Sequence, residues 1–459
     1  MSTVAAPFDL AGSERTRPTG EAWWRPAPVR RAAATGALEG TGIAFAALVA
    51  FTVILLLSPQ AWFPILKVVR IALLSAGIAI AAHVVERTIH RQPVTPLAPE
   101  IGVVLALVAW SVITIPMSVW PGGSMRLLTD QYLKAIAFFW LLSTVVTTRA
   151  RMRMLAWALV LCSIPLAATG VKNYLFGDHL LATGVSGFTR ISGYMGGSGL
   201  TGNPNDLALM LNLLIPIAGA LALNEKGFKR SVAVGAMLLA IAGVVVTFSR
   251  AGFLTLAATF VMFLAVLARR KAPGIAMGLL LLAMCAPPLM PSGYMDRLST
   301  ITDIEADKTG SAQGRWQDFK VATDLVIESP LVGAGLGNDA IVLNKERGLA
   351  TWRSVHNAYL QYAVDLGIPG VLLFAWLHLM CIRSARAVEK RTANDPSMRD
   401  LANLAAGVQM ALIGFFVAAL FHPIAYQFYF FSVAGLAVAL KNTCRAEIAL
   451  ARATEQHSL

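Results

Sequence analysis

The sequence predicts an all-α polytopic membrane protein with about twelve transmembrane helices. Hydrophobic residues make up 56% of the 459 residues and charged residues only 14%, whereas an ordinary soluble domain carries about 25% charged residues. Apolar stretches long enough to cross a bilayer as a helix, about 20 residues each, recur along most of the chain. The net charge of +13 does not indicate nucleic-acid binding, because the basic residues lie in short segments between the apolar stretches.

Twelve apolar segments are the candidate transmembrane helices. In chain order they cover residues 38–57, 65–82, 98–116, 131–147, 152–170, 204–223, 231–248, 251–268, 273–290, 364–382, 402–421 and 423–440. The fourth and fifth segments, and the seventh and eighth, are separated by few residues, so each pair predicts a tight hairpin.

The basic residues orient these spans. Most of the 38 Lys and Arg residues face the cytoplasm if the N-terminus lies inside, as the positive-inside rule requires. The protein is then expected in a bacterial inner membrane with its unusual polar residues on the periplasmic side. The predicted regions are a cytoplasmic N-terminal tail (1–37), helices one to nine (38–290), one long periplasmic loop with a catalytic segment between spans nine and ten (291–363), helices ten to twelve (364–440) and a cytoplasmic C-terminal tail (441–459).

Three arginines on the predicted periplasmic side are candidate phosphate ligands. Arg250 follows Ser249 and interrupts the apolar run VVVTFSRAGFLTL, Arg315 stands in GSAQGRWQDFK, and Arg190 stands in GFTRISGYMGG. Guanidinium suits this role because its planar fork binds phosphate through two hydrogen bonds and stays charged. A hairpin turn whose arginine reaches lipid headgroups is the structural alternative for Arg250.

Two neighbouring patterns predict local structure. Trp316 and Phe319 beside Arg315 indicate an amphipathic segment lying along the membrane surface. Asn203 and Pro204 predict a helix start, with asparagine as the N-cap and proline at the first helical position.

His356 lies in WRSVHNAYLQYAVDLGIPG, where a polar loop gives way to an apolar segment. Ser354 is a candidate N-cap, which would place His356 in the first helical turn, where the helix dipole lowers a histidine pKa. A neutral imidazole accepts a proton, so His356 is the candidate general base, and Asn357 and Tyr359 are candidate supporting residues. A histidine bonded to lipid headgroups is the alternative.

Three further features have simpler interpretations. The carboxylates of DIEAD (303–307) resemble cation ligands, but a solvated loop is favoured. GAGLGND (333–339) predicts a turn, because no strand precedes it and no P-loop lysine follows. His422, between the last two spans, is a candidate for the same cavity as His356. No cysteine or histidine spacing predicts a metal site.

Together these residues suit glycosyl transfer from a pre-activated donor at the outer membrane face. The outer compartment of a bacterium has no nucleotide pool, so a polyprenyl-diphosphate-linked sugar is the expected donor. The arginines would neutralise the leaving diphosphate, and His356 would deprotonate the acceptor hydroxyl. No metal or other cofactor is expected.

Three stretches carry a resemblance to a known family: RISGYMGGSGLTGNPNDLALML, TFSRAGFLTLA, and GRWQDFKVATDLVIESPLVGAGLGN running on to HNAYLQYAVDLGIPG. Over about residues 188–375 the sequence resembles the O-antigen ligase and O-antigen polymerase (Wzy-like) superfamily of polytopic glycosyltransferases. The resemblance implies that Arg250 and Arg315 bind undecaprenyl diphosphate and that His356 is catalytic. It also implies an inverting, metal-free and ATP-independent transfer at the periplasmic face.

The implied partners are an undecaprenyl-diphosphate-linked glycan as donor and membrane lipid around it. Lipid A-core would be the acceptor of a ligase, and a second lipid-linked repeat unit the acceptor of an O-antigen or exopolysaccharide polymerase. Relatives that glycosylate protein hydroxyls keep a protein O-oligosaccharyltransferase open. A polysaccharide transporter or flippase is disfavoured, because most spans lack charge at their centres. A metal-dependent oligosaccharyltransferase is also disfavoured, because the first outer loop, SPQAWFP, has no carboxylate.

Overall fold

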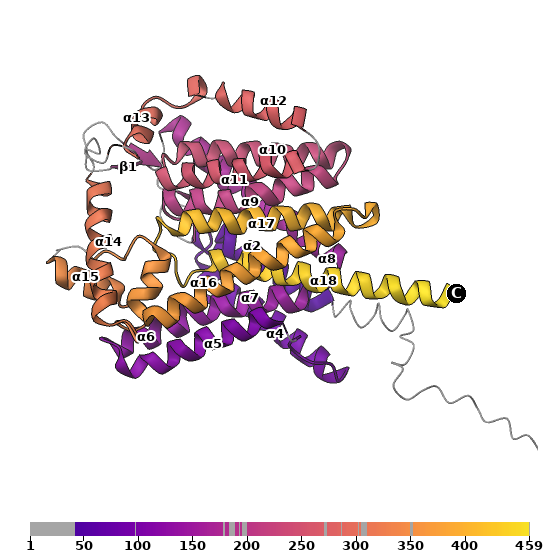
Figure 1. The fold of residues 1–459 in the computed structure, drawn as a ribbon, viewed down its shortest axis with the longest axis horizontal. Helices are drawn as coiled ribbons and strands as arrows, with labels where there is room; N and C mark the ends of the chain where they lie inside the picture. The colour runs from indigo at the N-terminus through magenta and orange to yellow at the C-terminus, as the bar shows by residue number, and fades with distance from the viewer. Residues whose placement is uncertain are drawn as a thin grey trace, which may run out of the picture.

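The computed structural model forms a bundle of α-helices (Figure 1). It describes residues 42–96, 98–177, 180–182, 189–191, 193–194, 200–269, 273–285, 287–301, 303, 310–348 and 352–458. The predicted N-terminal tail 1–37 therefore lies outside the described residues. The predicted class, an all-helical polytopic membrane protein, is confirmed.

Within the described residues, eight helices are long and apolar enough to cross a membrane, and each corresponds to a predicted span. They are α4 (Ile71–Ile89), α5 (Pro99–Thr114, continued to Met117 by the 3-10 turn η2, Ile115–Met117), α8 (Arg149–Phe176), α9 (Pro204–Asn224), α10 (Gly227–Val246), α11 (Arg250–Arg269), α16 (Ala358–Thr392) and α17 (Arg399–Ala419, preceded by the 3-10 turn η6, Pro396–Met398).

The other four predicted spans have different forms, so the count of twelve is not confirmed. Helix α2 (Gly42–Leu57) has 16 residues, and α7 (Leu133–Val145) has 13 after a π-helical turn, η3 (Leu128–Tyr132). Helix α12 (Pro273–Met284) has 12 residues and ends shortly before two consecutive prolines, which a helix interior does not tolerate. Helix α18 (Phe428–Ser458) has 31 residues, but its second half is polar and runs through the predicted tail.

Short elements complete the chain. They are η1 (Pro59–Ala61), α3 (Ile65–Val68), α6 (Pro121–Leu127), β1 (Leu180–Ala182), β2 (Thr189–Ile191), η5 (Pro287–Leu289), α13 (Tyr294–Ser299), α14 (Ser311–Glu328) and α15 (Asp339–Arg347). Strands β1 and β2 pair antiparallel, with Leu181 opposite Arg190.

Helices α9 and α17 form the interior of the bundle, since both are buried along most of their length. They approach closely at Gly407 of α17, where a Cβ atom would lie 2.7 Å from the carbonyl oxygen of Pro216. Small residues permit this contact between membrane helices. The predicted start of α9 is confirmed: the Asn203 side chain accepts hydrogen bonds from the backbone N–H groups of Asn205 and Asp206, and Pro204 is the first helical residue.

The segment between α12 and α16 lies at one end of the bundle, and the C-terminus of α18 lies at the other (Figure 1). Helix α14 runs across the ends of the long helices instead of parallel to them, and α15 lies beside it. This is the arrangement expected of a segment lying along a membrane surface. We call this end, which carries α13, α14 and α15, the loop end.

Candidate active site

Two adjoining cavities, each of about 250 Å³, open at the loop end. Arg250, Ala251, Arg315 and His356 line both of them, so three of the predicted site residues meet there. The polar cavity is lined in addition by Arg190, Asn205, Phe248, Arg297 and Ser311. The apolar cavity is lined in addition by Leu254, Thr300, Ile301, Ala312, Trp316, Phe319, Val355, Asn357, Leu360, Leu420 and Phe421.

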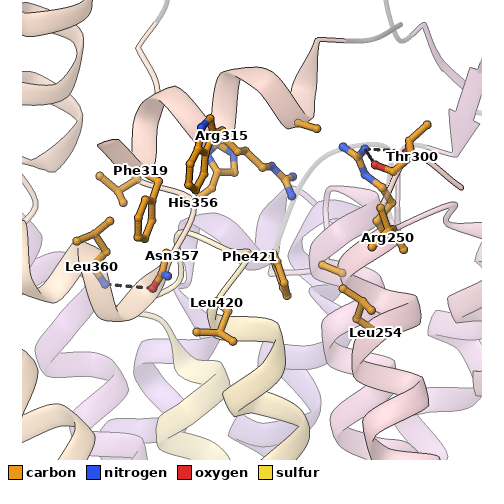
Figure 2. A pocket seen from close by; sticks show the side chains of 15 residues that line it. Arg250, Leu254, Thr300, Arg315, Phe319, His356, Asn357, Leu360, Leu420 and Phe421 are labelled. Atoms are coloured by element: carbon orange, nitrogen blue, oxygen red, sulfur yellow. Dashed lines mark hydrogen bonds between the residues drawn. The ribbon is translucent and has the colours of Figure 1, made fainter. Parts of the chain in front are cut away.

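The hairpin between α10 and α11 positions Arg250. Phe248 has a φ of 51°, a left-handed conformation that is strained for a residue with a side chain. The Ser249 hydroxyl then accepts a hydrogen bond of 3.1 Å from the Gly252 N–H and so caps α11. Arg250 begins α11 and donates a 2.9 Å hydrogen bond from Nη1 to the Thr300 hydroxyl, which holds its guanidinium beside Thr300 (Figure 2).

Arg190 reaches the polar cavity from strand β2. Its Nε donates to the Thr247 carbonyl oxygen at 2.9 Å, and its Nη2 donates to Asn205 Oδ1 at 3.0 Å. Ser249 donates to the same Asn205 oxygen at 2.9 Å, which ties β2 to the start of α11. Burial, and then the positive charges of Arg297, Arg315 and Arg250, lower the pKa of Arg190 to about 9.

Arg315 and Arg297 complete a set of four arginines around the polar cavity. Arg315 is in the first half of α14, and its guanidinium points toward Arg250 from the other side of the apolar cavity (Figure 2). Arg297, in α13, was missed by the sequence analysis. The only signal in the sequence is its place in the same long loop as Arg315. Four clustered cations repel one another, so the cavity is suited to a multiply charged anion.

His356 lies beside Arg315 at the boundary of the two cavities (Figure 2). Burial first, and then the charge of Arg315, lower its pKa to about 4; Arg353 acts in the same direction and the Ser354 carbonyl against it. Its Nδ1 is buried and makes no hydrogen bond within the described residues. The imidazole is therefore neutral at neutral pH, as predicted.

The predicted reason for this neutrality was wrong. The N-cap of α16 is Asn357, not Ser354, because the Asn357 side chain accepts hydrogen bonds from the N–H groups of Tyr359 and Leu360 at 3.0 and 3.1 Å. His356 therefore precedes the helix instead of lying in its first turn. Burial and Arg315 depress its pKa.

The predicted supporting residues have different surroundings. Asn357 lines the apolar cavity, while its side-chain oxygen caps α16. Ser249 caps α11 and holds Asn205. Tyr359 lines neither cavity. Gly367, with a φ of 68° and a ψ of −173°, breaks α16 into two helical parts. The Tyr359 hydroxyl in the first part lies 2.8 Å from Nδ1 of His378 in the second part, and the two rings stack.

The remaining candidates contribute less to these cavities. Of the DIEAD carboxylates only Asp303 falls within the described residues, and the described residues contain no group of three or more His, Cys, Asp or Glu side chains that could hold a metal ion. GAGLGND forms a turn, as predicted. His422 lines neither cavity: it is buried, its Nδ1 donates to the Ala418 carbonyl oxygen at 2.9 Å, and burial lowers its pKa to about 4.

The helical bundle defines a multi-pass membrane protein, and four arginines line the polar cavity at its loop end. Residues 235–375 match the family model described as O-antigen ligase, and residues 36–184 match a family of unknown function (DUF5935). The chain thus carries an O-antigen ligase domain, and the predicted class, a membrane glycosyltransferase of the O-antigen ligase and polymerase type, is confirmed. No curated protein matches the chain. The ligase match contains Arg250, Arg297, Arg315 and His356, whereas Arg190 lies outside both matches.

Proposed function

We propose that the protein transfers a glycan from undecaprenyl diphosphate to a hydroxyl group of a second lipid-anchored saccharide at the periplasmic face. The observation that supports this most directly is that four arginines and one neutral histidine line a single cavity. Arg250, Arg315, Arg190 and Arg297 bind the diphosphate, and His356 is the general base. The acceptor is lipid A-core in a ligase or a second repeat unit in a polymerase.

The apolar cavity fits the lipid part of this donor. Leu254, Phe319, Leu420 and Phe421 line it together with Arg250. A prenyl diphosphate needs such a surface, because its charged head and its hydrocarbon chain are joined covalently and must be bound side by side. The stacked rings of Trp316 and Phe319, both about half exposed at 53% and 44%, extend the apolar surface along α14.

In the proposed reaction the acceptor oxygen bonds to the anomeric carbon of the glycan from the side opposite the diphosphate. The bond between that carbon and the phosphate oxygen breaks, and its electron pair leaves on the diphosphate. The proton of the acceptor hydroxyl passes to Nε2 of His356, since Nδ1 is enclosed. The arginines stabilise the charge that develops on the leaving oxygen, a contribution that fixed, dehydrated donors make efficiently.

The distribution of charge supports this proposal over a transporter. The two cavities that Arg250, Arg315 and His356 line are at the loop end, which α13 and α14 form, and not at mid-bundle, whereas transporter sites lie near the membrane midplane. With the loop end in the periplasm, the C-terminal end of α18 is cytoplasmic, in line with the positive-inside rule.

Reconstitution tests the proposal. The purified protein in lipid nanodiscs is given a synthetic undecaprenyl-diphosphate glycan and a lipid-linked acceptor saccharide, without nucleotide and with EDTA. Release of undecaprenyl diphosphate with formation of the longer glycan is expected. Turnover that requires a divalent cation would argue against the base mechanism and for a metal site that includes Asp303.

The glycolipids of a deletion strain then identify the acceptor. Accumulated long lipid-linked glycan indicates a ligase, and accumulated single repeat units indicate a polymerase. Loss of glycan from a periplasmic protein, with lipopolysaccharide unchanged, indicates a protein O-oligosaccharyltransferase. Donor movement across the bilayer without transfer would replace the proposal with a flippase.

A further inference from the structure

Asp339, which the proposed mechanism does not use, is bonded to the backbone next to the proposed base. It is the first residue of α15 and is only 2% exposed. Its Oδ2 accepts a 2.8 Å hydrogen bond from the Val355 N–H, and its Oδ1 accepts a 3.3 Å hydrogen bond from Nε2 of Gln361. The carboxyl group therefore connects α15 to the residue directly before His356.

The backbone is fixed on both sides of His356. On one side, Val355 is 1% exposed and packs with Ala322 of α14, Leu343 of α15 and Val364 of α16. On the other side, Asn357 caps α16. The Val355 side of this segment depends on a hydrogen bond to a side chain that is distant in sequence, because Asp339 lies 16 residues away.

A second buried carboxyl group holds Asp339 in place. Asp365 of α16 accepts a 2.7 Å hydrogen bond on Oδ1 from the Asp339 N–H and a 2.8 Å hydrogen bond on Oδ2 from the Tyr426 hydroxyl. Its backbone carbonyl also accepts a 2.8 Å hydrogen bond from the Gly335 N–H. Gly335 has a φ of +96°, and a Cβ atom there would lie 2.2 Å from the Ser118 side chain, so the glycine-rich turn is required for this docking.

The hydrogen-bond donors to the Asp339 carboxyl group are N–H groups of Val355, Gln361 and Ala340 and the Ser354 hydroxyl, not a cation. Burial raises the pKa of Asp339. An acceptor placed at this depth is costly unless it is hydrogen-bonded, and its removal leaves the buried Val355 N–H without a partner. Loss of the Asp339 carboxyl group is therefore expected to destabilise the backbone at Val355, the residue directly before His356.

We propose that Asp339 is a positioning residue of the transferase, which fixes the imidazole of His356 against Arg315 through the Val355 backbone. The inference rests on the proposed role of His356 as general base. Without the Asp339 carboxyl group, the segment 353–357 loosens and His356 becomes solvated. Its geometry toward the acceptor and its acid–base behaviour then change together.

The charged and titratable groups around His356 decide whether its pKa rises or falls when it becomes solvated. They are Arg315 on α14, Arg353 on the same loop, His422 on the loop after α17, and Arg190, Arg250 and Arg297 across the polar cavity. Burial is the largest influence on the pKa of His356 and all the neighbouring arginines are cationic, so solvation raises that pKa toward its ordinary value of 6.5. The acid limb of kcat/KM, which reports the free enzyme, moves to higher pH.

The test compares Asp339→Leu and Asp339→Asn in the full-length protein in nanodiscs. Asp339→Leu removes both acceptor oxygens, and we expect kcat to fall about 10²-fold, the effect of a misplacement of about 1 Å, with donor KM changed much less and the acid limb shifted upward. Asp339→Asn keeps one acceptor oxygen, so smaller changes in the same directions are expected. Asp318→Asn is the matched control, since Asp318 is a buried carboxylate of the same region that pairs with Arg347 instead, and its acid limb should not move.

An Asp339→Leu enzyme with wild-type kcat and an unmoved acid limb would overturn the inference. So would a loss of kcat without any shift of the limb, because that is the signature of a merely structural role. If Asp339→Leu does not fold, Asp339→Asn decides: a partial upward shift supports the inference and no shift overturns it. Full transfer by His356→Ala would reject the proposed function instead.

Discussion

Arg315 and His356 line the same two cavities, and the charge of Arg315 is, after burial, the largest influence that lowers the pKa of His356. A base with a pKa of about 4 is neutral at pH 7 but binds a proton weakly. The negative charge of a bound diphosphate offsets the positive charge of Arg315. It therefore raises the pKa of His356 in the donor complex, where the imidazole must accept a proton. Substrate binding would thus strengthen the base.

This relationship predicts two different acid limbs. The limb of kcat/KM reports the free enzyme and should lie near pH 4, whereas the limb of kcat reports the donor complex and should lie at higher pH. Initial rates from about pH 3 to pH 9, at low and at saturating donor, provide both profiles. In Arg315→Gln the free-enzyme limb should move upward, because loss of a neighbouring cation favours the imidazolium. Coincident limbs in the wild type would contradict the coupling.

His356→Ala should reduce glycan transfer to a small residual rate while the protein still inserts and binds donor. A positioned general base contributes about 10²- to 10⁴-fold to the rate, so the loss in kcat should lie in that range. Transfer is followed by release of radiolabelled undecaprenyl diphosphate, and insertion by extraction from membranes. His90→Ala, a change at the exposed C-cap of α4, is the control and should transfer normally.

The predictability of the fold differed along the chain. Each of the eight helices that match a predicted span contains a stretch of 18 residues with high mean hydropathy and at most two charged residues, so composition alone was enough to predict them. The failures have local causes, such as the proline pair 287–288 after α12 or the polar half of α18. Neither changes the class of the protein, but each changes the count of spans.

The site residues also differed in how well the sequence alone predicted them. Arg250 is conspicuous in sequence because it interrupts an apolar run, and the structure places it in both cavities. Arg297 and Asp339 look like ordinary loop residues, since the place of Arg297 in the polar cavity and the burial of Asp339 arise only when α13 and α15 pack at the loop end. His356 was predicted to be neutral for the wrong reason, because its burial and its neighbour Arg315 depend on tertiary contacts that no local pattern encodes.

Arg250→Lys should lower kcat/KM for the donor roughly 10²-fold, as expected for the loss of one fixed donor to a developing anion. Lysine keeps the charge but cannot supply two parallel hydrogen bonds to a phosphate, and it cannot hold the Thr300 hydroxyl in the same geometry. Steady-state kinetics with varied donor measure the effect. Full activity of this variant would reject the phosphate clamp.

A matched substitution controls for the loss of an arginine as such. Arg126, on α6, lines neither cavity within the described residues, and its side chain is 81% exposed beside Asp130. Arg126→Lys should leave kcat/KM unchanged.

Arg297→Gln should weaken donor binding without destabilising the protein. Among the neighbouring charges, Arg297 is the first that lowers the pKa of Arg190, so its removal relieves repulsion in the donor-free cavity. Donor Kd should rise about 10- to 100-fold, because a hydrogen bond to a charged group contributes about 1.5–3 kcal/mol. The Tm of the donor-free protein should stay equal or increase.

Arg347→Gln, a change at the same end of the molecule, is expected to have the opposite effects on Tm and donor Kd. Arg347 pairs with the buried Asp318, so its removal leaves an uncompensated carboxylate and should lower Tm, whereas donor Kd should change little because Arg347 lines neither cavity. Thermal unfolding and donor titration of both variants separate the two roles. A lower Tm with unchanged donor Kd in Arg297→Gln would make Arg297 a structural residue and leave the diphosphate to the other three arginines.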